Sequence, residues 1–141
     1  DILLEAKNKE ADNKGIYFEC TNDIVFSNLC ISPFALIKVL SNIIDNAIQA
    51  LEDTKRSNKT IAFSLADDII FYIISVSNNG NKIPEDKAAK IFEQGYSTKA
   101  KEGRGYGLYI VKKTLNRYNC MIDLKSTEEA TEFIIKIPKV C

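Results

Sequence analysis

The chain has 141 residues, with 19 Lys and Arg balanced by 19 Asp and Glu, so its formal net charge is zero. This length predicts one domain, and 45% hydrophobic with 27% charged residues excludes a disordered or collagen-like chain. The zero charge removes the broad electrostatic argument for binding nucleic acid or an anionic membrane. The chain contains no histidine, which excludes a Ser-His-Asp or Cys-His nucleophile, a His-ligated zinc site and a phosphohistidine within it.

The four cysteines, Cys20, Cys30, Cys120 and Cys141, form no C-x-x-C pair. They could form two disulfides, but a domain of this size does not depend on covalent cross-links for stability. We therefore expect buried free thiols in a reducing cytosol. The sequence shows no signal peptide and no apolar run near 18 residues, so we expect any membrane anchor to lie outside this chain, with no direct membrane contact here.

The first half of the chain predicts a strand followed by a long helix. Residues 1–12 are charged and compatible with a helix, and because they begin abruptly without Met we expect the tail of a preceding helix. A turn signal at 13–15 leads to a predicted strand over 16–20. Ser32 and Pro33 are typical of the cap and first position of a helix, which we expect to end near Asp53.

A predicted hairpin and a long connection follow. Residues 59–66 and 69–77 are rich in Ile, Phe and Tyr, and the acidic pair between them indicates a turn. Residues 78–106 contain four Gly and little periodicity, with a short helix expected at 85–92. Connections of this length inside a domain are usually functional lids or binding loops.

The last part of the chain predicts a helix over 107–118 and a strand pair over 121–126 and 132–137. Most strands are therefore sequential hairpins, with helices between the pairs. This order favours an α+β fold, a two-layer sandwich with helices on one face of a mixed sheet.

The long helix carries a stripe of amides. At 100° per residue, Asn42, Asn46 and Gln49 fall within about 60° of one another, with Asp45 beside them. The stripe could be an ordinary solvated face, but such faces are usually made of Lys and Glu because Asn is a poor helix former. Asn42 and Asn46 would place two neutral carbonyl oxygens side by side, which suits a hard cation such as Mg2+. The opposite face is apolar and contains Leu36, Ile37, Leu40, Ile43, Ile44, Ala47, Ile48 and Leu51.

Two glycine-containing loops follow this helix. Residues 103–108 (GRGYGL) precede the second helix, whose N-terminal N–H groups and dipole would favour phosphate. Ser97, Thr98 and Lys99 add hydroxyls and a cation nearby. The pattern matches neither a Rossmann fingerprint nor a P-loop, and alone it could be a flexible loop. Residues 77–84 (SNNGNKIP) could likewise be an ordinary turn.

The order of these segments is more specific than any one of them. Residues 40–51 (LSNIIDNAIQAL), 77–84, Phe92 and 103–108 resemble the N, G1, F and G2 boxes of the ATP-binding catalytic domain of bacterial sensor histidine kinases. These domains have the Bergerat fold shared with DNA gyrase and MutL. The resemblance covers residues from about 14 to 138. The pattern is most similar to kinases of the citrate-sensor and peptide quorum-sensor types.

This resemblance implies a mostly antiparallel mixed sheet with helices on one face, and an ATP-binding domain over 13–141 that follows a dimerisation helix ending within 1–12. It implies Asn46 as the principal Mg2+ ligand, with Asn42 assisting, and residues 84–106 as an ATP lid. The residues implied to contact the nucleotide are Asn46, Gln49, Asn78, Gly80, Ile83, Phe92, Ser97, Thr98, Lys99, Gly103, Arg104, Gly105, Gly107 and Leu108.

Three departures from the family pattern bear on function. Asn78 stands where the family has an Asp that accepts a hydrogen bond from the adenine amino group, and a neutral acceptor is weaker than a charged one. Lys82 replaces a second glycine, and Gln49 stands where many relatives have a Lys that contacts phosphate. We therefore expect weak ATP binding. Asn42 stands where gyrase and MutL have a catalytic Glu, so hydrolysis by this chain alone should be very slow.

The function implied by the resemblance is transfer of the γ-phosphate of Mg-ATP to a histidine on a separate dimerisation domain, with a response regulator as the further partner and a cytoplasmic location. Two alternatives share the fold. The altered G1 box could mark a pseudokinase or protein-interaction module that has lost useful ATP affinity. A serine kinase that inhibits a sigma factor would need no histidine at all.

Overall fold

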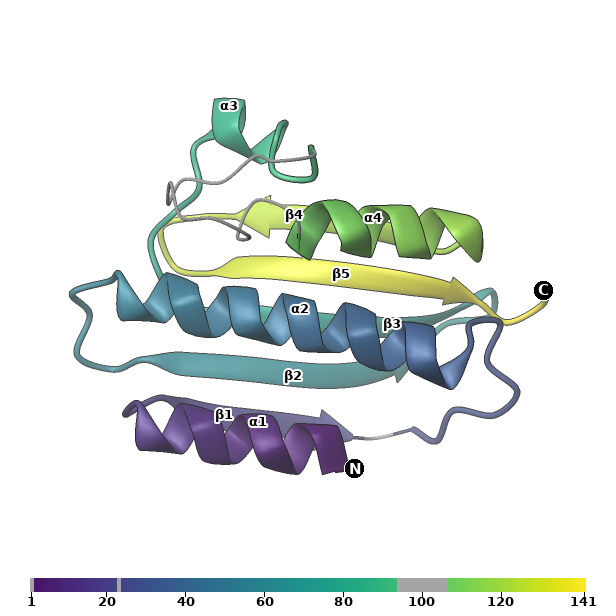
Figure 1. Ribbon diagram of the computed structural model, residues 1–141, viewed down its shortest axis with the longest axis horizontal. Coiled ribbons are helices and arrows are strands. Elements are labelled where there is room, and N and C mark those ends of the chain that lie inside the picture. The colour runs from purple at the N-terminus through teal and green to yellow at the C-terminus, as the bar shows by residue number, and fades with distance from the viewer. Residues whose placement is uncertain (1, 23, 94–106) are drawn as a thin grey trace.

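The structure is a computed structural model that describes residues 2–22, 24–93 and 107–141. The side chains of Ile2 and Asn22 are not described. Three helices lie side by side over one face of a five-stranded sheet (Figure 1). The elements are α1 (Ile2–Asn13), β1 (Tyr17–Asn22), α2 (Pro33–Glu52), β2 (Thr60–Asp67), β3 (Phe71–Asn78), α3 (Glu85–Ala88), α4 (Gly107–Arg117), β4 (Met121–Ser126) and β5 (Thr131–Pro138).

The strand order is β1-β2-β3-β5-β4. β1 and β2 are parallel, whereas the other neighbouring strands are antiparallel. The predicted α+β sandwich with a mixed, mostly antiparallel sheet is therefore confirmed. Because β5 lies between β3 and β4, Asn78 at the end of β3 is paired with Thr131 at the start of β5.

The core lies between the sheet and α2. Ser32 caps this helix by accepting a hydrogen bond of 3.2 Å from the Ala35 N–H, as its sequence predicted. The apolar stripe is buried only from Val39 onward. Ile37 was expected in this stripe but is 50% exposed, because it lies on the early part of α2, where Phe34 is also exposed. The buried core residues of α2 are Val39, Leu40, Ile43, Ile44, Ala47, Ile48 and Leu51.

Contrary to the sequence-based expectation, one described helix is long and apolar enough to cross a membrane by length and composition alone. This helix is α2. The core helix of a soluble domain passes the same test, and the buried residues of α2 pack with β3 and β5 residues in the hydrophobic core. Its length and hydropathy are therefore weak evidence for a membrane span.

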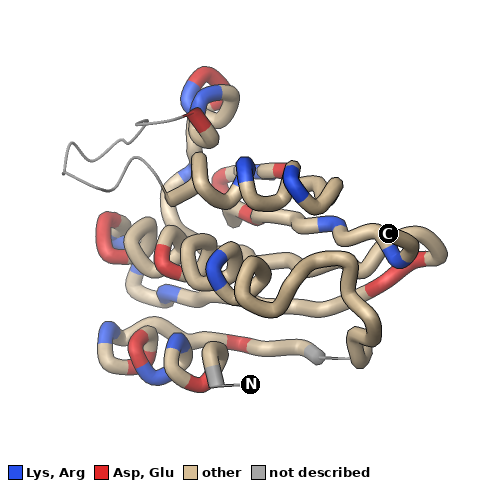
Figure 2. The backbone as a smooth tube through the Cα atoms, turned by 45° about the vertical axis from the view of Figure 1, so that its right-hand side comes forward, with Lys and Arg blue, Asp and Glu red and all other residues tan. Residues whose placement is uncertain are grey.

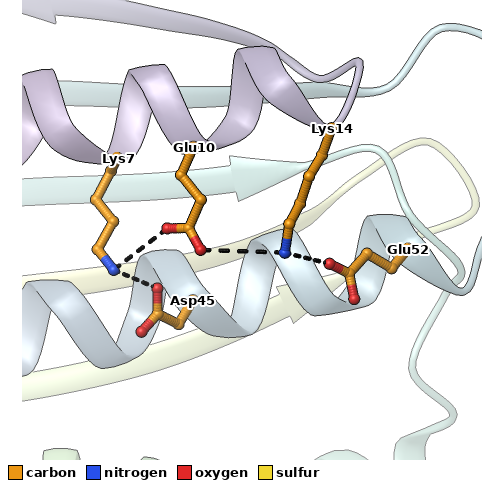
Figure 3. A network of polar contacts seen from close by, with 5 residues as sticks. All are labelled: Lys7, Glu10, Lys14, Asp45 and Glu52. Carbon is orange, nitrogen blue, oxygen red and sulfur yellow. Dashed lines mark hydrogen bonds and ion pairs between the residues drawn. The ribbon is translucent and has the colours of Figure 1, made fainter.

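α1 packs on the same face as α2 (Figure 1). Ala11 is fully buried, and Leu3 and Leu4 pack against the core. Lys7 Nζ lies 2.5 Å from Asp45 Oδ1 of α2, and Lys14 Nζ, just after α1, lies 2.6 Å from Glu52 Oε1, as Figure 3 shows. Residues 2–13 are therefore an integral part of this helical layer, whatever precedes them in a longer protein.

The expectation that all four cysteines are buried free thiols is wrong. Cys30 and Cys141 form a disulfide with their Cα atoms 5.3 Å apart. It joins the segment before α2 to the segment after β5, which the sheet brings together although they are 111 residues apart in sequence. Cys20 is a free but exposed thiol, and Cys120 is free and buried, as expected for it.

Candidate functional site

The amides of α2 lie on the side of the helix that is not buried against the sheet. Asn42, Asn46 and Gln49 are each half-buried. Asp45, which lies among them in sequence, directs its carboxylate to Lys7 of α1. The stripe therefore presents neutral amide groups, while its carboxylate is neutralised by a neighbouring helix.

The N and G2 boxes meet in the structure. Gly107 begins α4, and a methyl group placed on it would lie 3.6 Å from Asn42 Oδ1. Leu108 packs against the core, which fixes the start of α4 beside α2. The other predicted G2 and lid contacts, Ser97, Thr98, Lys99, Gly103, Arg104 and Gly105, lie outside the described residues.

The G1 box closes β3 with a tight turn against α2. Asn78 is only 3% exposed, and its Oδ1 accepts a hydrogen bond of 2.9 Å from the Gly80 N–H. A methyl group on Gly80 would lie 2.9 Å from Asn78 Oδ1 and 3.2 Å from the Ala50 carbonyl oxygen. Only glycine fits this approach of the turn to the α2 backbone without a shift.

The remaining asparagines of this turn have structural partners. Asn79 Oδ1 accepts a hydrogen bond of 2.8 Å from the Thr60 N–H at the start of β2. Asn81 Oδ1 accepts a hydrogen bond of 3.2 Å from the buried Thr54 hydroxyl. The run of asparagines is therefore partly explained as turn chemistry that anchors β3 to its neighbours.

Two hydroxyls that the sequence interpretation did not include lie beside the G1 box. The Ile83 N–H donates a hydrogen bond of 2.8 Å to Ser126 Oγ, which lies 2.6 Å from Thr131 Oγ1. Thr131 is 3% exposed and is paired with Asn78 across the sheet. Thr131 lies two residues before the buried Phe133 and therefore on the same face of β5. This two-residue period is the sequence signal that could have identified Thr131 as buried.

The F box is fixed by aromatic packing rather than by a long helix. The predicted helix at 85–92 ends at Ala88 in α3. Beyond it, the N–H groups of Lys90 and Glu93 each donate to the carbonyl oxygen three residues earlier, so the segment continues as turns. Phe92 contacts Phe133 edge to face with ring centroids 6.1 Å apart, and Lys112 Nζ of α4 lies 5.9 Å from the Phe92 centroid. Phe92 therefore joins this turn to β5 and α4.

Charge is distributed without a single dominant sign, and α1 and α3 each carry acidic and basic residues (Figure 2). In the part of the chain that the structure describes, no group of three or more His, Cys, Asp and Glu side chains could hold a metal ion. An anionic ligand here would be held by local groups rather than by a broad basic surface.

A separate cavity of about 440 Å3 opens beside the G1 turn. It is lined by Arg56, Asn81, Lys82, Pro84 and Glu128, none of which is a predicted nucleotide contact. Among the described residues, the predicted nucleotide contacts on α2, at the end of β3 and at the start of α4 do not line this cavity.

The comparisons with known proteins agree with this arrangement. Residues 32–140 match the model of the family described as histidine kinase-, DNA gyrase B-, and HSP90-like ATPase. The chain is 34% identical over 105 residues to a probable C4-dicarboxylate sensor kinase of Halalkalibacterium halodurans, covering 74% of this chain and 20% of that protein. It is 36% identical over 105 residues to the sensor histidine kinase DpiB of Escherichia coli, covering 72% and 19%. The chain spans about a fifth of the length of these relatives.

Solved structures show the same fold. The catalytic domain of histidine kinase ThkA has a TM-score of 0.79 and 27% identity, covering 97% of this chain and 92% of that chain. Full-length ShkA in complex with AMPPNP has a TM-score of 0.81 at 21% identity, covering 96% of this chain and 28% of that chain.

The fold and these similarities define an ATP-binding catalytic domain of the two-component sensor kinase type. The chain belongs to the histidine kinase-, DNA gyrase B-, and HSP90-like ATPase family, whose model matches more than half of it. The resemblance drawn from the order of the four boxes is thereby confirmed.

Proposed function

We propose that this chain binds Mg-ATP between α2 and the segment 84–106, and donates the γ-phosphate to a histidine on a separate dimerisation domain. The single observation that carries the proposal is the proximity of Asn42 on α2 to Gly107 at the start of α4. It brings an amide stripe suited to a cation against a helix N-terminus suited to phosphate.

The donor set fits Mg2+ held jointly with a nucleotide. Asn46 as principal ligand and Asn42 as assistant would contribute neutral amide oxygens. Both side chains are half-buried, and Asn42 lies beside the start of α4. A site with so few protein ligands suits Mg2+, which keeps several waters and binds substrate phosphates. When bound, the ion would neutralise charge on the transferred phosphoryl group.

The residues of this chain would position the nucleotide rather than act as bases. Asn42 cannot accept a proton at neutral pH. The N-terminal N–H groups of α4, beginning at Gly107, would bind phosphate oxygens, and Gln49 extends the polar side of α2 by about one turn. Phosphoryl transfer depends mainly on positioning and charge stabilisation. Hydrolysis by this chain alone is therefore expected to be very slow.

The partners follow from the same proposal. Relatives described as sensor kinases and a sensor histidine kinase are about five times longer than the matched segment. We therefore place the phosphoacceptor histidine, the dimerisation helices and the contacts to a response regulator outside this chain, and the catalytic reaction in the cytoplasm. Neither nucleic acid nor a direct membrane contact has a role in the proposal.

The test is nucleotide titration by calorimetry and thermal melting, with and without Mg2+. The wild-type chain should bind Mg-ATP with a Kd between micromolar and low millimolar, which corresponds to a free energy of binding of about −8 to −4 kcal/mol. Asn46→Ala and Asn46→Asp should lose the Mg-dependent rise in melting temperature. Asn8→Ala, at an exposed position of α1, is the matched control. An equal Mg-ATP effect in Asn46→Ala would show that Asn46 is not a metal ligand.

The second candidate, a protein-interaction module without useful ATP affinity, is favoured by the neutral Asn78 and by Lys82 in the G1 box. No detectable binding at millimolar nucleotide would support it. Incubation of the chain with labelled ATP and a histidine-bearing dimerisation domain from a relative distinguishes a histidine kinase from the serine kinase alternative. Acid-labile phosphate on that domain supports the histidine kinase, whereas its absence despite ATP binding favours the serine kinase.

A further inference from the structure

The Cys30–Cys141 disulfide lies where the segment before α2 meets the C-terminal segment (Figure 1). Cys30 stands two residues before Ser32, the cap of α2, and Cys141 follows the end of β5. Cys30 is half-buried against the core, whereas Cys141 is exposed. A small thiol or disulfide in solution can therefore reach the Cys141 sulfur.

A disulfide is unusual in the compartment that the proposed function requires. Thiols are kept reduced in the cytoplasm, and the disulfides that do form there are usually transient and either catalytic or redox-sensing. This domain has an extensive hydrophobic core, so it is not one of the small domains that need disulfides in order to fold. Exposed disulfides are also reduced more easily than buried structural ones. The pair is therefore suited to reversible exchange.

We propose, on the basis of the proposed function and its cytoplasmic location, that Cys30 and Cys141 form a redox switch that responds to small thiols and disulfides. The exposed Cys141 thiolate attacks a small disulfide RSSR, which forms a mixed disulfide and releases RS−. The Cys30 thiolate then attacks the Cys141 sulfur, which forms the protein disulfide and releases the second RS−. Two electrons pass from the protein thiols to RSSR, and the two thiol protons end on two RSH molecules.

Ser32 connects this cysteine pair to both helices of the proposed nucleotide site. Its Oγ accepts a hydrogen bond of 3.2 Å from the Ala35 N–H in the first turn of α2. It accepts another of 3.1 Å from the hydroxyl of Tyr118, which directly follows α4. α2 carries Asn46, the predicted Mg2+ ligand, and α4 begins at Gly107. The disulfide therefore holds the segment that joins the start of α2 to the end of α4.

Reduction should loosen this segment without unfolding the domain. Residues 24–32 form neither helix nor strand. Ile31 is 3% exposed, and the centroid of the Phe26 ring lies 4.7 Å from that of the Tyr72 ring. These contacts remain in the dithiol form, but loss of the covalent link makes local opening of the helix cap more frequent. We expect the disulfide form to bind Mg-ATP about fivefold more tightly, because binding then has less of the chain to order.

The first experiment equilibrates the chain in buffers of reduced and oxidised glutathione and counts free thiols by alkylation and intact mass. Cys20→Ser is the reference chain, because the exposed Cys20 thiol would itself react. Its count should change from three free thiols to one, the buried Cys120. Adding Cys30→Ser should leave a glutathione adduct at Cys141, because no second thiol resolves it. Adding Cys141→Ser should give an adduct more slowly, because Cys30 is half-buried.

The second experiment compares the two redox forms of the reference chain. Calorimetry should give an about fivefold lower Kd for Mg-ATP in the disulfide form. Amide hydrogen exchange over residues 24–35 should be slower in that form, because the cap segment opens less often. The variant that also carries Cys30→Ser should match the reduced form in both buffers, since it cannot form the link.

The outcomes separate this inference from the proposed function. The switch is overturned if the Cys30–Cys141 bond fails to form in oxidised glutathione, if it persists in reduced glutathione, or if both forms exchange amide hydrogens at the same rate. An equal Kd for Mg-ATP in the two forms overturns the link to the nucleotide site and leaves the proposed function standing. If neither form binds Mg-ATP at millimolar concentration, the proposed function is overturned, and the thiol counts and hydrogen exchange decide on the switch alone.

Discussion

The ammonium of Lys7 on α1 lies 2.5 Å from the Asp45 carboxylate on α2. Lys7 also lies 3.6 Å from Glu10 on its own helix. Both contacts belong to the small network of ion pairs between α1 and α2 (Figure 3). This contact has two consequences for the site. It orients the only carboxylate of the amide stripe away from the proposed metal position, and it attaches α1 to the helix that carries Asn46.

Reversal of the charge at Lys7 alone should destabilise the domain modestly. The Lys7 side chain is 15% exposed and that of Asp45 is 42% exposed, so solvent screens the pair only partly. We expect Lys7→Glu to lower the free energy of unfolding by about 1 kcal/mol, as for other partly exposed pairs. Lys7→Glu with Asp45→Lys should recover part of the loss. Urea unfolding measures both, with Lys9→Glu, exposed on the same helix, as the control. No recovery in the double variant would contradict the pairing.

Gly80→Ala should destabilise the domain and weaken nucleotide binding together. The added methyl group would lie within 2.9 Å of Asn78 Oδ1 and 3.2 Å of the Ala50 carbonyl, and the latter belongs to helix backbone that cannot easily move. We expect a loss of about 1–3 kcal/mol from overpacking. Gly107→Ala is the matched control for stability, because its methyl group would be at ordinary contact distance from Asn42. Equal melting temperatures for the two variants would contradict this account.

The fold could be predicted because its signals are local. Ser32 and Pro33 mark the start of α2, and strands, helices and turns alternate with clear boundaries. What sequence could not supply depends on distance in space. Cys30 and Cys141 are 111 residues apart and meet only because β5 runs beside β3 and ends at the same side as the start of α2, as Figure 1 shows.

The candidate site was predicted as a set of boxes but not as a set of orientations. The sequence places Asn42 and Asn46 on one helix face, because the helical period is regular. It does not show that Asp45 is directed to Lys7, that the Asn78 side-chain oxygen accepts from the Gly80 N–H, or that Thr131 lies opposite Asn78. Each of these depends on contacts between elements. Such contacts decide which atoms remain available to a ligand.

The disulfide should make stability depend on reductant. Cys30 and Cys141 close a loop of more than a hundred residues, and native cross-links of this kind typically contribute about 2–4 kcal/mol. Dithiothreitol and Cys30→Ser should each lower the melting temperature, and reductant should have no further effect on the variant. Cys20→Ser, at an exposed free thiol, is the control. An intact mass that shows four free thiols in the untreated protein would contradict the pairing.

Cys120 should make the domain less stable at alkaline pH. It is 4% exposed, and burial raises the pKa of its thiol from the ordinary value of 9.0 to about 11. The neutral thiol is therefore favoured over the thiolate more strongly in the folded state than in the unfolded state. Its contribution to stability is complete below pH 9 and is lost as the pH rises through about 11.

Unfolding measured from pH 8 to 11 tests this dependence. Other groups titrate in the same range, so the relevant quantity is the difference in pH slope between variants. Cys120→Ala should be less stable than wild type at pH 8, because it leaves a cavity, but should lose less further stability up to pH 11. Cys20→Ser should follow the wild-type slope, because that thiol is exposed. If Cys120→Ala and wild type show the same slope, the Cys120 thiol does not contribute to the alkaline loss of stability.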